Sequence, residues 1–238
     1  MSEQFFNGVS WPARVKCLGK PMRVVMSFAS GEDMERISAW ADNEDWEGNY
    51  SLGPLNSTGH LTQDQRDVLE YVALLGGMYQ TYDLKERFAD SANRLEHVIR
   101  ENPREDVLFA LVMKLPDAPF GEAPAPFASG EILGFSAMRR TWKNSVKMEF
   151  LASSPFHMGA EMGMQGVGKA LLTASVLLSA SLFAPMFWAE SSDTSIGYYM
   201  NPRWKFKTLE EIVYLDSAGI AGFVKGTTRR PPWYFPKT

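Results

Sequence analysis

The chain has 238 residues, of which 45% are hydrophobic and 22% charged, which is the composition of a globular protein and not of a disordered one. Its formal net charge of −4 provides no positive field that would attract nucleic acid or an anionic membrane, so we expect neither as a partner. The single cysteine, Cys17, excludes an intrachain disulfide, and the first twenty residues show no signal-peptide pattern. We therefore expect one cytoplasmic domain.

The first part of the chain predicts one strand followed by helices. Ser30 and Asp33 have the spacing of a capping box, and Thr62 with Gln65 forms a second one. Apolar residues at helical spacing follow both boxes. The pattern predicts a strand, a capped helix, a loop and two further helices, at residues 23–28, 30–41, 43–60, 62–77 and 84–99.

From residue 106 onward the apolar period changes from that of helices to that of strands. Three strand-length runs are followed by one long helix, a buried strand and a short helix. The connection at 139–144 has hairpin length and implies antiparallel pairing. Two further strands are expected within 204–225, around a turn at Asp216 to Gly219. The other elements are strands at 107–113, 131–138 and 145–152, a loop at 116–126, a helix at 167–182, a strand at 185–190 and a helix at 195–200.

A run of uncharged residues, Ala170 to Ala189, is long enough to span a membrane as a helix. Pro185 interrupts the run, and four hydroxyl side chains make it less apolar. A helix that ends near Phe183 and a buried strand at 186–190 account for the same residues. We therefore expect two core elements here and no membrane span. The hydroxyl side chains belong to Thr173, Ser175, Ser179 and Ser181.

Three glycines, Gly163, Gly166 and Gly168, precede or open the predicted helix at 167–182. Backbone N–H groups at the amino-terminal end of a helix, together with its partial positive charge, favour a bound phosphate. The spacing differs from the nucleotide-binding loop Gly-x-x-x-x-Gly-Lys-Ser/Thr, and Ala170 stands where that loop needs a magnesium-binding hydroxyl. It also differs from the dinucleotide motif Gly-x-Gly-x-x-Gly. The segment predicts a pyrophosphate cradle of another class.

Two segments resemble the GNAT acetyltransferase superfamily. Leu-Ala-Ser-Ser-Pro at 151–155, followed by Gly-Val-Gly-Lys-Ala-Leu-Leu at 166–172, is similar to the family's coenzyme A motif, commonly Arg/Gln-x-x-Gly-x-Gly/Ala. Ile-Gly-Tyr-Tyr-Met-Asn-Pro-Arg-Trp at 196–204 resembles the family's later Tyr-x-x-x-Gly-Phe segment. Gly163 replaces the Arg or Gln of the first motif, and Arg203-Trp204 replaces the Gly-Phe of the second. The resemblance covers residues 20 to about 225.

The resemblance implies an α/β (α+β) fold, the acyl-CoA N-acyltransferase (GNAT) fold. This fold has a mixed, mostly antiparallel sheet flanked by helices, here with a helical insertion at 44–104 between the first and second strands. The implied reaction moves an acyl group, acetyl in the simplest case, from acyl-CoA to a primary amine by direct attack. The expected acceptor is an amine of a small molecule or of a protein, and a homodimer is compatible with the sequence.

The resemblance also implies roles for particular residues. Tyr199, five residues before Trp204, corresponds to the family's general acid, with Tyr198 as the neighbouring alternative, and Glu149 corresponds to the base. A Tyr that only packs a short helix and a Glu that only faces solvent are the structural alternatives. The residues expected to bind acetyl-CoA are Leu151, Ser153, Gly163, Gln165, Gly166, Val167, Gly168 and Lys169. Those expected to bind the amine are Glu190, Ser191 and Asp193.

The three histidines, His60, His97 and His157, are scattered and are accompanied by one cysteine, so we expect no metal site. The basic, aromatic tail at 226–238 is expected to pack its rings onto the domain. The alternative function is a catalytically silent GNAT-like module that binds CoA or a protein partner, which the irregular glycine motif would fit.

Overall fold

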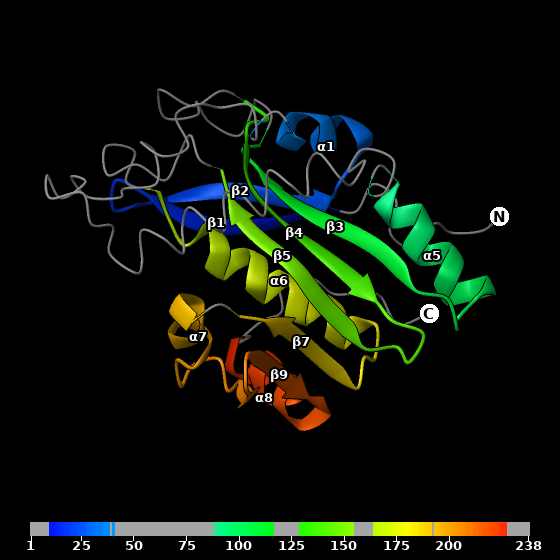
Figure 1. Cartoon of the computed structure of the whole chain (residues 1–238). Coiled ribbons are helices and arrows are strands. Elements are labelled where there is room, and N and C mark those ends of the chain that lie inside the picture. The colour runs from blue at the N-terminus through cyan, green and yellow to red at the C-terminus, as the bar shows by residue number, and fades with distance from the viewer. Residues whose placement is uncertain are drawn as a thin grey trace, which may run out of the picture.

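Figure 1 shows the computed structural model of the chain, which describes residues 10–38, 40, 88, 90–116, 129–154, 164–191 and 193–227. Several predicted features lie outside these residues. They are the loop at 43–60, the helix at 62–77, the loop at 117–126, Gly163 and the tail beyond 227.

The described strands form one nine-stranded sheet with the order β6-β1-β2-β3-β4-β5-β7-β9-β8. Neighbouring strands are antiparallel except β5 and β7, which run parallel. The sheet is therefore mixed and mostly antiparallel, as predicted. The strands are β1 (Ser10–Cys17), β2 (Lys20–Phe28), β3 (Val107–Lys114), β4 (Ile132–Arg140), β5 (Val146–Ser153), β6 (Met164–Gln165), β7 (Met186–Glu190), β8 (Lys207–Leu209) and β9 (Ile212–Asp216).

Helices cover both faces of this sheet. On β3, Phe109 and Leu111 belong to a core cluster that contains residues of α6 and α8, whereas Ala110 and Val112 belong to a second cluster that contains residues of α1. This alternation is the period of two expected for a strand buried on both faces. The described helices are α1 (Gly31–Ser38), α5 (Ser91–Glu101), α6 (Val167–Ser181), α7 (Asp193–Tyr199) and α8 (Ser217–Thr227).

The capping box predicted at Ser30 is confirmed. The Ser30 backbone N–H donates to Asp33 Oδ2 at 2.9 Å, and the Asp33 N–H donates to Ser30 Oγ at 3.2 Å. Two backbone donors at the start of α1 are thereby satisfied by local side chains. The helix begins directly after β2, in agreement with the predicted order of strand and helix.

The first strand of the sheet was not predicted. β1 pairs with β2 through a tight turn at Leu18 and Gly19, which have φ values of 49° and 77°. Positive φ at both central residues is typical of the type I′ hairpin turn. The sequence indicates this hairpin only by a single glycine between two runs of alternating residues. Pro12 lies within the first run, and proline argues against a strand. The insertion after α1 consequently lies between the second and third strands, and not between the first and second.

The expected second strand of the 204–225 segment is instead a helix. β8 and β9 form a hairpin, and α8 then begins at Ser217. Asp216 caps this helix, because its Oδ1 accepts a hydrogen bond from the Gly219 backbone N–H at 2.8 Å. Buried Ile220 and Phe223 lie three residues apart, which is helical spacing. Gly219 was interpreted as a turn residue, although it lies in the first turn of α8.

The uncharged run at 170–189 is divided between α6, a turn and β7, as expected for two core elements. Buried hydroxyls in α6 are satisfied within the helix, since Ser175 Oγ donates to the Leu171 carbonyl and Ser179 Oγ to the Ser175 carbonyl. In the described part of the chain, no helix has the length and apolarity needed to cross a membrane. The start of α6 packs closely on β4 at Gly134, where a Cβ atom would lie 2.7 Å from Val167 Cγ1.

Candidate active site

The parallel strands β5 and β7 pair only over part of their length. Their register runs from Val146↔Phe187 to Met148↔Ala189, after which β5 continues to Ser153 and, among the described strands, pairs there with β4. Figure 1 shows the two strands diverging toward their carboxyl ends. Residues 149–153 therefore lie on the side of β5 that faces the split, beyond the end of its pairing with β7.

A β-bulge lies at the point where the split begins. Across the β4–β5 ladder, Ala137 pairs with Phe150 and Met138 pairs with Met148, so Glu149 is the extra residue. A bulge changes the direction of the strand and of the side chain it carries. Glu149 thus occupies the position on β5 where regular pairing with both neighbouring strands is interrupted.

The amino-terminal end of α6 has no side-chain cap. Its N-cap residue, Gly166, adopts a left-handed conformation with φ 90° and ψ 5°, and the first helical hydrogen bond runs from the Ala170 N–H to the Gly166 carbonyl. The N–H groups of residues before Ala170 have no carbonyl partner within the helix, so they can donate to a ligand. The space next to Gly166 is open, because an added Cβ would meet no atom within 4 Å. The geometry suits an anion.

The other predicted cradle residues surround this end of the helix. Val167 is buried as the first residue of α6, Gly168 follows it, and Lys169 is exposed. Gln165 was expected in the cradle loop but forms part of β6, where it pairs with Lys16 of β1. This short strand attaches the approach to α6 to the edge of the sheet.

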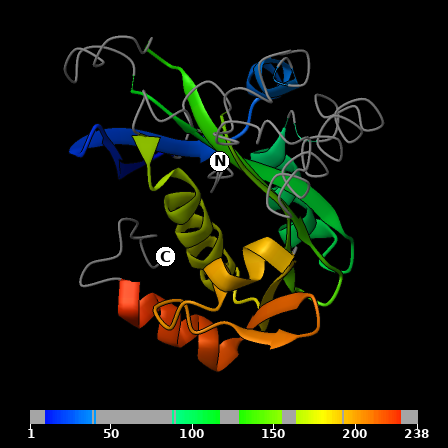
Figure 2. The ribbon, with the colours of Figure 1, turned by 60° about the vertical axis from the view of Figure 1, so that its left-hand side comes forward.

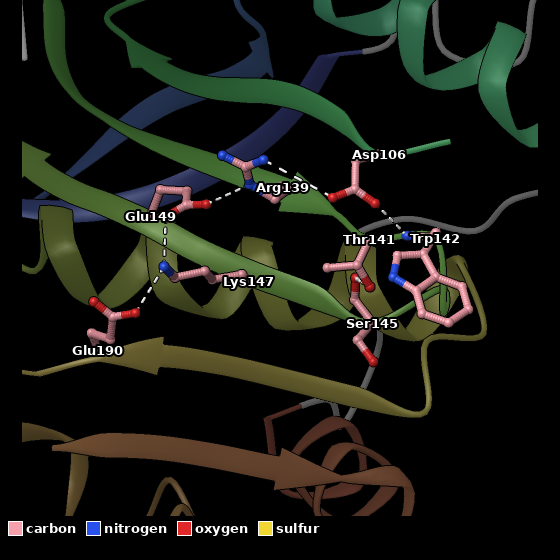
Figure 3. A network of polar contacts seen from close by, with 8 residues as sticks. All are labelled: Asp106, Arg139, Thr141, Trp142, Ser145, Lys147, Glu149 and Glu190. Carbon is pink, nitrogen blue, oxygen red and sulfur yellow. Dashed lines mark hydrogen bonds and ion pairs between the residues drawn. The ribbon is translucent and has the colours of Figure 1, made fainter. Parts of the chain in front are cut away.

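An ionic network crosses β4, β5 and β7 beside the split (Figure 3). Arg139 Nε lies 2.7 Å from Glu149 Oε1, and Lys147 Nζ lies 2.9 Å from Glu149 Oε2. The Lys147 ammonium also contacts Glu190 at 2.9 Å. Burial would lower the pKa of Lys147, but its hydrogen bonds to Glu190 and Glu149 and their negative charges outweigh burial, so its pKa is raised. The network holds a charged lysine between two carboxylates.

The two adjacent tyrosines of α7 have different surroundings. Tyr199 is buried at 6% exposure and packs against Phe206, whereas Tyr198 is 40% exposed and packs against Trp204. Burial raises the pKa of Tyr198 to about 12, and burial together with the neighbouring Tyr198 raises the pKa of Tyr199 further. Both phenols therefore remain protonated at neutral pH, as a general acid requires.

The three residues predicted to bind the amine follow one another at the end of β7. Glu190 is 65% exposed in its side chain and contacts Lys147. Ser191 is buried, and both its N–H and its hydroxyl donate to the Glu211 carbonyl, at 2.8 and 2.9 Å. Asp193 is the first residue of α7, and its side chain lies outside the described atoms. In this arrangement Ser191 anchors the end of β7 to the turn between β8 and β9.

The order of elements around the split decides the fold. An antiparallel hairpin, β4–β5, leads to a helix that opens at the two glycines, then to a parallel strand that separates from β5, and then to the short helix with the tyrosine pair. The chain has the GNAT fold. This was the fold implied by the resemblance of the two sequence segments.

Comparisons with known proteins found similar solved structures at low sequence identity. No family model and no curated protein matches the sequence. The PaiA N-acetyltransferase of Thermoplasma acidophilum, solved in complex with coenzyme A, is 16% identical, with 82% of this chain and 99% of that chain covered and a TM-score of 0.47. The GNAT domain of S. lividans PAT is 16% identical, with coverage of 87% and 97% and a TM-score of 0.43. YncA of Salmonella typhimurium, with acetyl-CoA, is 11% identical, with coverage of 81% and 93% and a TM-score of 0.37.

The partners of Glu149 were not predicted from the sequence. Lys147 lies two positions before it on the same strand, a period-two signal that places both side chains on one face. Arg139 could be found only from the register between β4 and β5, which the sequence does not specify. Within the described residues, no group of three His, Cys, Asp or Glu side chains is arranged to hold a metal ion.

Proposed function

We propose that the chain transfers an acyl group, acetyl in the simplest case, from acyl-CoA to a primary amine. One observation supports this proposal above the others. The part of β5 that continues past its pairing with β7, residues 149–153, and the amino-terminal end of α6 without a side-chain cap follow each other in the chain. A ligand with an extended arm and a pyrophosphate could place the arm beside β5 and the pyrophosphate at the start of α6.

The donor would bind chiefly through backbone groups. Leu151 and Ser153, which lie on β5 beyond its pairing with β7, would contact the pantetheine arm. The N–H groups of Val167, Gly168 and Lys169 would receive the pyrophosphate, with Gly163 and Gln165 preceding them in the chain. Left-handed Gly166 turns the backbone into the helix without placing a side chain in the way.

A buried hydroxyl directly after the end of β5 also fits a bound ligand. Ser154 has 0% exposure, and its Oγ has no hydrogen-bond partner among the residues that the structure describes. Its backbone N–H is already used, because it donates to the Leu133 carbonyl at 2.8 Å. A buried hydroxyl without a partner is uncommon, and a polar ligand beside residue 154 would satisfy it.

The thioester supplies an activated carbonyl carbon, and the chain supplies proton transfers and positioning. Glu149 would accept a proton from the acceptor ammonium, directly or through water, so that the amine nitrogen can form a bond to the carbonyl carbon as the carbon–sulfur bond breaks. Tyr199 would donate its proton to the leaving thiolate. In this structure both Glu149 oxygens are held by cations, so accepting a proton requires Glu149 to move away from Lys147 or Arg139.

The acceptor would approach from the side of the ionic network. Glu190, Ser191 and Asp193 follow β7, and Glu190 together with Glu149 forms a pair of carboxylates that already binds one ammonium, that of Lys147. The same chemistry would hold the ammonium of a substrate. A cationic acceptor, whether a small amine or a protein amine, therefore fits this end of the sheet.

The test combines calorimetry with turnover on the full chain. Acetyl-CoA should bind, and free CoA thiol should appear when a primary amine is added from a panel that includes polyamines, lysine peptides and peptide N-termini. Glu149→Gln should retain acetyl-CoA binding and lose about 100-fold or more of kcat. If the chain does not bind acetyl-CoA, the proposal fails.

The second candidate is a catalytically silent module of the same fold. Two observations favour it: Glu149 is held by two cations, and Tyr199 is buried. This candidate predicts that acetyl-CoA binds but that no amine in the panel releases thiol. Amine-dependent thiol release that Glu149→Gln abolishes would exclude it.

A further inference from the structure

A basic groove lies outside the β5–β7 split. It has a volume of about 1200 Å³ and is bordered by β1 and β2, the first half of α6, the loop after α7 and the end of α8. Figure 2 shows these elements together, with β1 in blue, α6 in olive and α8 in red. Its described lining contains five arginine or lysine residues and no carboxylate, in a chain that has more acidic than basic residues. The five cations are Arg14, Lys16, Arg23, Lys169 and Arg203.

The pairing of two of these cations is unfavourable in the free protein. Arg14 and Arg23 are directly opposite each other in the antiparallel register of β1 and β2. Like charges in such cross-strand positions destabilise a sheet. Neither forms an ion pair with a described carboxylate, whereas Arg139, Lys147 and Lys207 elsewhere in the sheet do. An anion bound next to Arg14 and Arg23 would remove this repulsion.

The groove is continuous with the end of α6. Gly166, the N-cap of α6, and Lys169, in its first turn, both line the groove. Lys16 pairs with Gln165, the residue that precedes Gly166, so β1 lies directly beside the approach to the helix. On the other side, Lys169 Nζ lies 5.7 Å from the centre of the Trp204 ring, next to Arg203. A ligand whose pyrophosphate bound at α6 would extend into this basic groove.

We propose that the groove binds the 3′-phosphoadenosine end of the acyl-CoA donor and that the β1–β2 hairpin recognises its 3′-phosphate. This inference rests on the proposed function, and it adds to the site an element that the glycine motif does not contain. A phosphorylated nucleoside matches the charge of the lining, and a groove of about 1200 Å³ is large enough to hold it. An extended polyanion such as nucleic acid fits less well, because the chain as a whole carries a net charge of −4.

The test compares CoA with 3′-dephospho-CoA, which lacks only the 3′-phosphate, by calorimetry on the full chain. The wild-type protein should bind CoA at least about tenfold more tightly, since each charge-assisted hydrogen bond to phosphate contributes that much. The double variant R14Q/R23Q should lose this preference, with CoA affinity falling to that of 3′-dephospho-CoA and the affinity for 3′-dephospho-CoA changing less than about twofold. Arg104→Gln, an exposed arginine outside the groove, is the charge-matched control and should keep the preference.

The possible results distinguish a failure of the hairpin proposal from a failure of the proposed function. If the wild-type protein binds neither ligand, the proposed function fails first. If it binds both ligands equally, or if R14Q/R23Q keeps the wild-type preference, recognition by the hairpin is wrong while donor binding stands. Equal losses for both ligands in R14Q/R23Q would also overturn it. Thermal melting checks folding, and R14Q/R23Q without ligand should melt no lower than the wild-type protein, because the substitution removes a repulsive pair.

Discussion

The Lys147 ammonium lies 2.9 Å from a carboxylate oxygen of Glu149, two residues away on β5. The same ammonium contacts Glu190 of β7, also at 2.9 Å, and lies 4.9 Å from the centre of the Trp188 ring. It therefore joins the two strands at the place where they begin to separate. In the proposed reaction, this lysine occupies the position between two carboxylates that suits a substrate ammonium.

The first prediction concerns stability and pH. Because the pKa of Lys147 in the folded chain is raised above 10.5, its contribution is fully present below pH 10.5 and is lost as the pH rises through the folded-state pKa. Lys147→Met keeps the apolar stem and should lower the free energy of unfolding by about 1 kcal/mol at neutral pH, a value reduced by solvent screening. The difference from the wild type should shrink above pH 10.5.

Urea unfolding at several pH values measures this difference. Lys143→Met, in the exposed turn between β4 and β5, is the matched control because its ammonium contacts only the neighbouring Trp142 ring among the described residues. A deficit for Lys147→Met that is the same at neutral and at strongly alkaline pH would show that packing, and not charge, accounts for it.

Local patterns in the sequence were sufficient to predict many elements. The capping box at Ser30, the continuous apolar run of β3 and the start of α6 after Gly166 each depend on residues close together in the chain. The end of α6 near Phe183 was predicted for the same reason. Such features need only spacing and side-chain chemistry, and the structure confirms them.

Features that depend on distant residues could not be predicted. The bulge at Glu149 is defined by the pairing of its neighbours, Phe150 with Ala137 and Met148 with Met138, and the ionic network depends on that register. The basic groove joins Arg23 of β2 to Arg203, which follows α7. The prediction for α8 was wrong because its glycines are typical of turns. The Asp216 cap and the burial of Phe223 stabilise a helix there instead.

The second prediction separates the two tyrosines. If Tyr199 is the acid, Tyr199→Phe should lower kcat at least about 100-fold with little change in acetyl-CoA affinity, and Tyr198→Phe should change kcat less than about threefold. Since burial raises the pKa of Tyr198 to about 12, and Tyr199 is shifted in the same direction, neither should cause an alkaline loss of activity near neutral pH. Stopped-flow thiol release across pH measures both effects. The opposite order of losses would assign the role to Tyr198.

The third prediction compares two glycines of the cradle. Gly166 has φ 90°, which an L side chain rarely adopts, whereas Gly168 lies within α6 and an added Cβ would lie 4.0 Å from Leu151 Cδ2. Gly166→Ala should lower the free energy of unfolding by about 1 kcal/mol and weaken acetyl-CoA binding about tenfold, because the first-turn N–H groups move. Gly168→Ala should be neutral or stabilising, because alanine favours the helix. Calorimetry and chemical unfolding of both variants measure this. Equal effects from the two substitutions would contradict the assigned geometry.

The fourth prediction concerns the end of α6. Phe183 has φ 53°, its N–H donates to the Ala180 carbonyl at 3.0 Å, and the Ala184 N–H donates to the Ser179 carbonyl at 3.0 Å. This is the Schellman arrangement, whose left-handed residue is usually glycine. The Phe183 side chain is 89% exposed, so it contributes little packing to offset the backbone strain. Phe183→Gly should raise the free energy of unfolding by about 0.5–1 kcal/mol and the melting temperature by roughly 2–4 °C.

Phe183→Ala is the control for this substitution, because it removes the ring but keeps a Cβ in the left-handed conformation. It should melt within about 1 °C of the wild-type protein, since an exposed ring contributes little. Scanning calorimetry of the two variants distinguishes backbone strain from packing. A loss of stability in both variants would mean that the ring packs in solution and that strain at the end of α6 is the smaller effect. A gain in Phe183→Gly alone would show that the strain stored at this turn is relieved when the Cβ atom is removed.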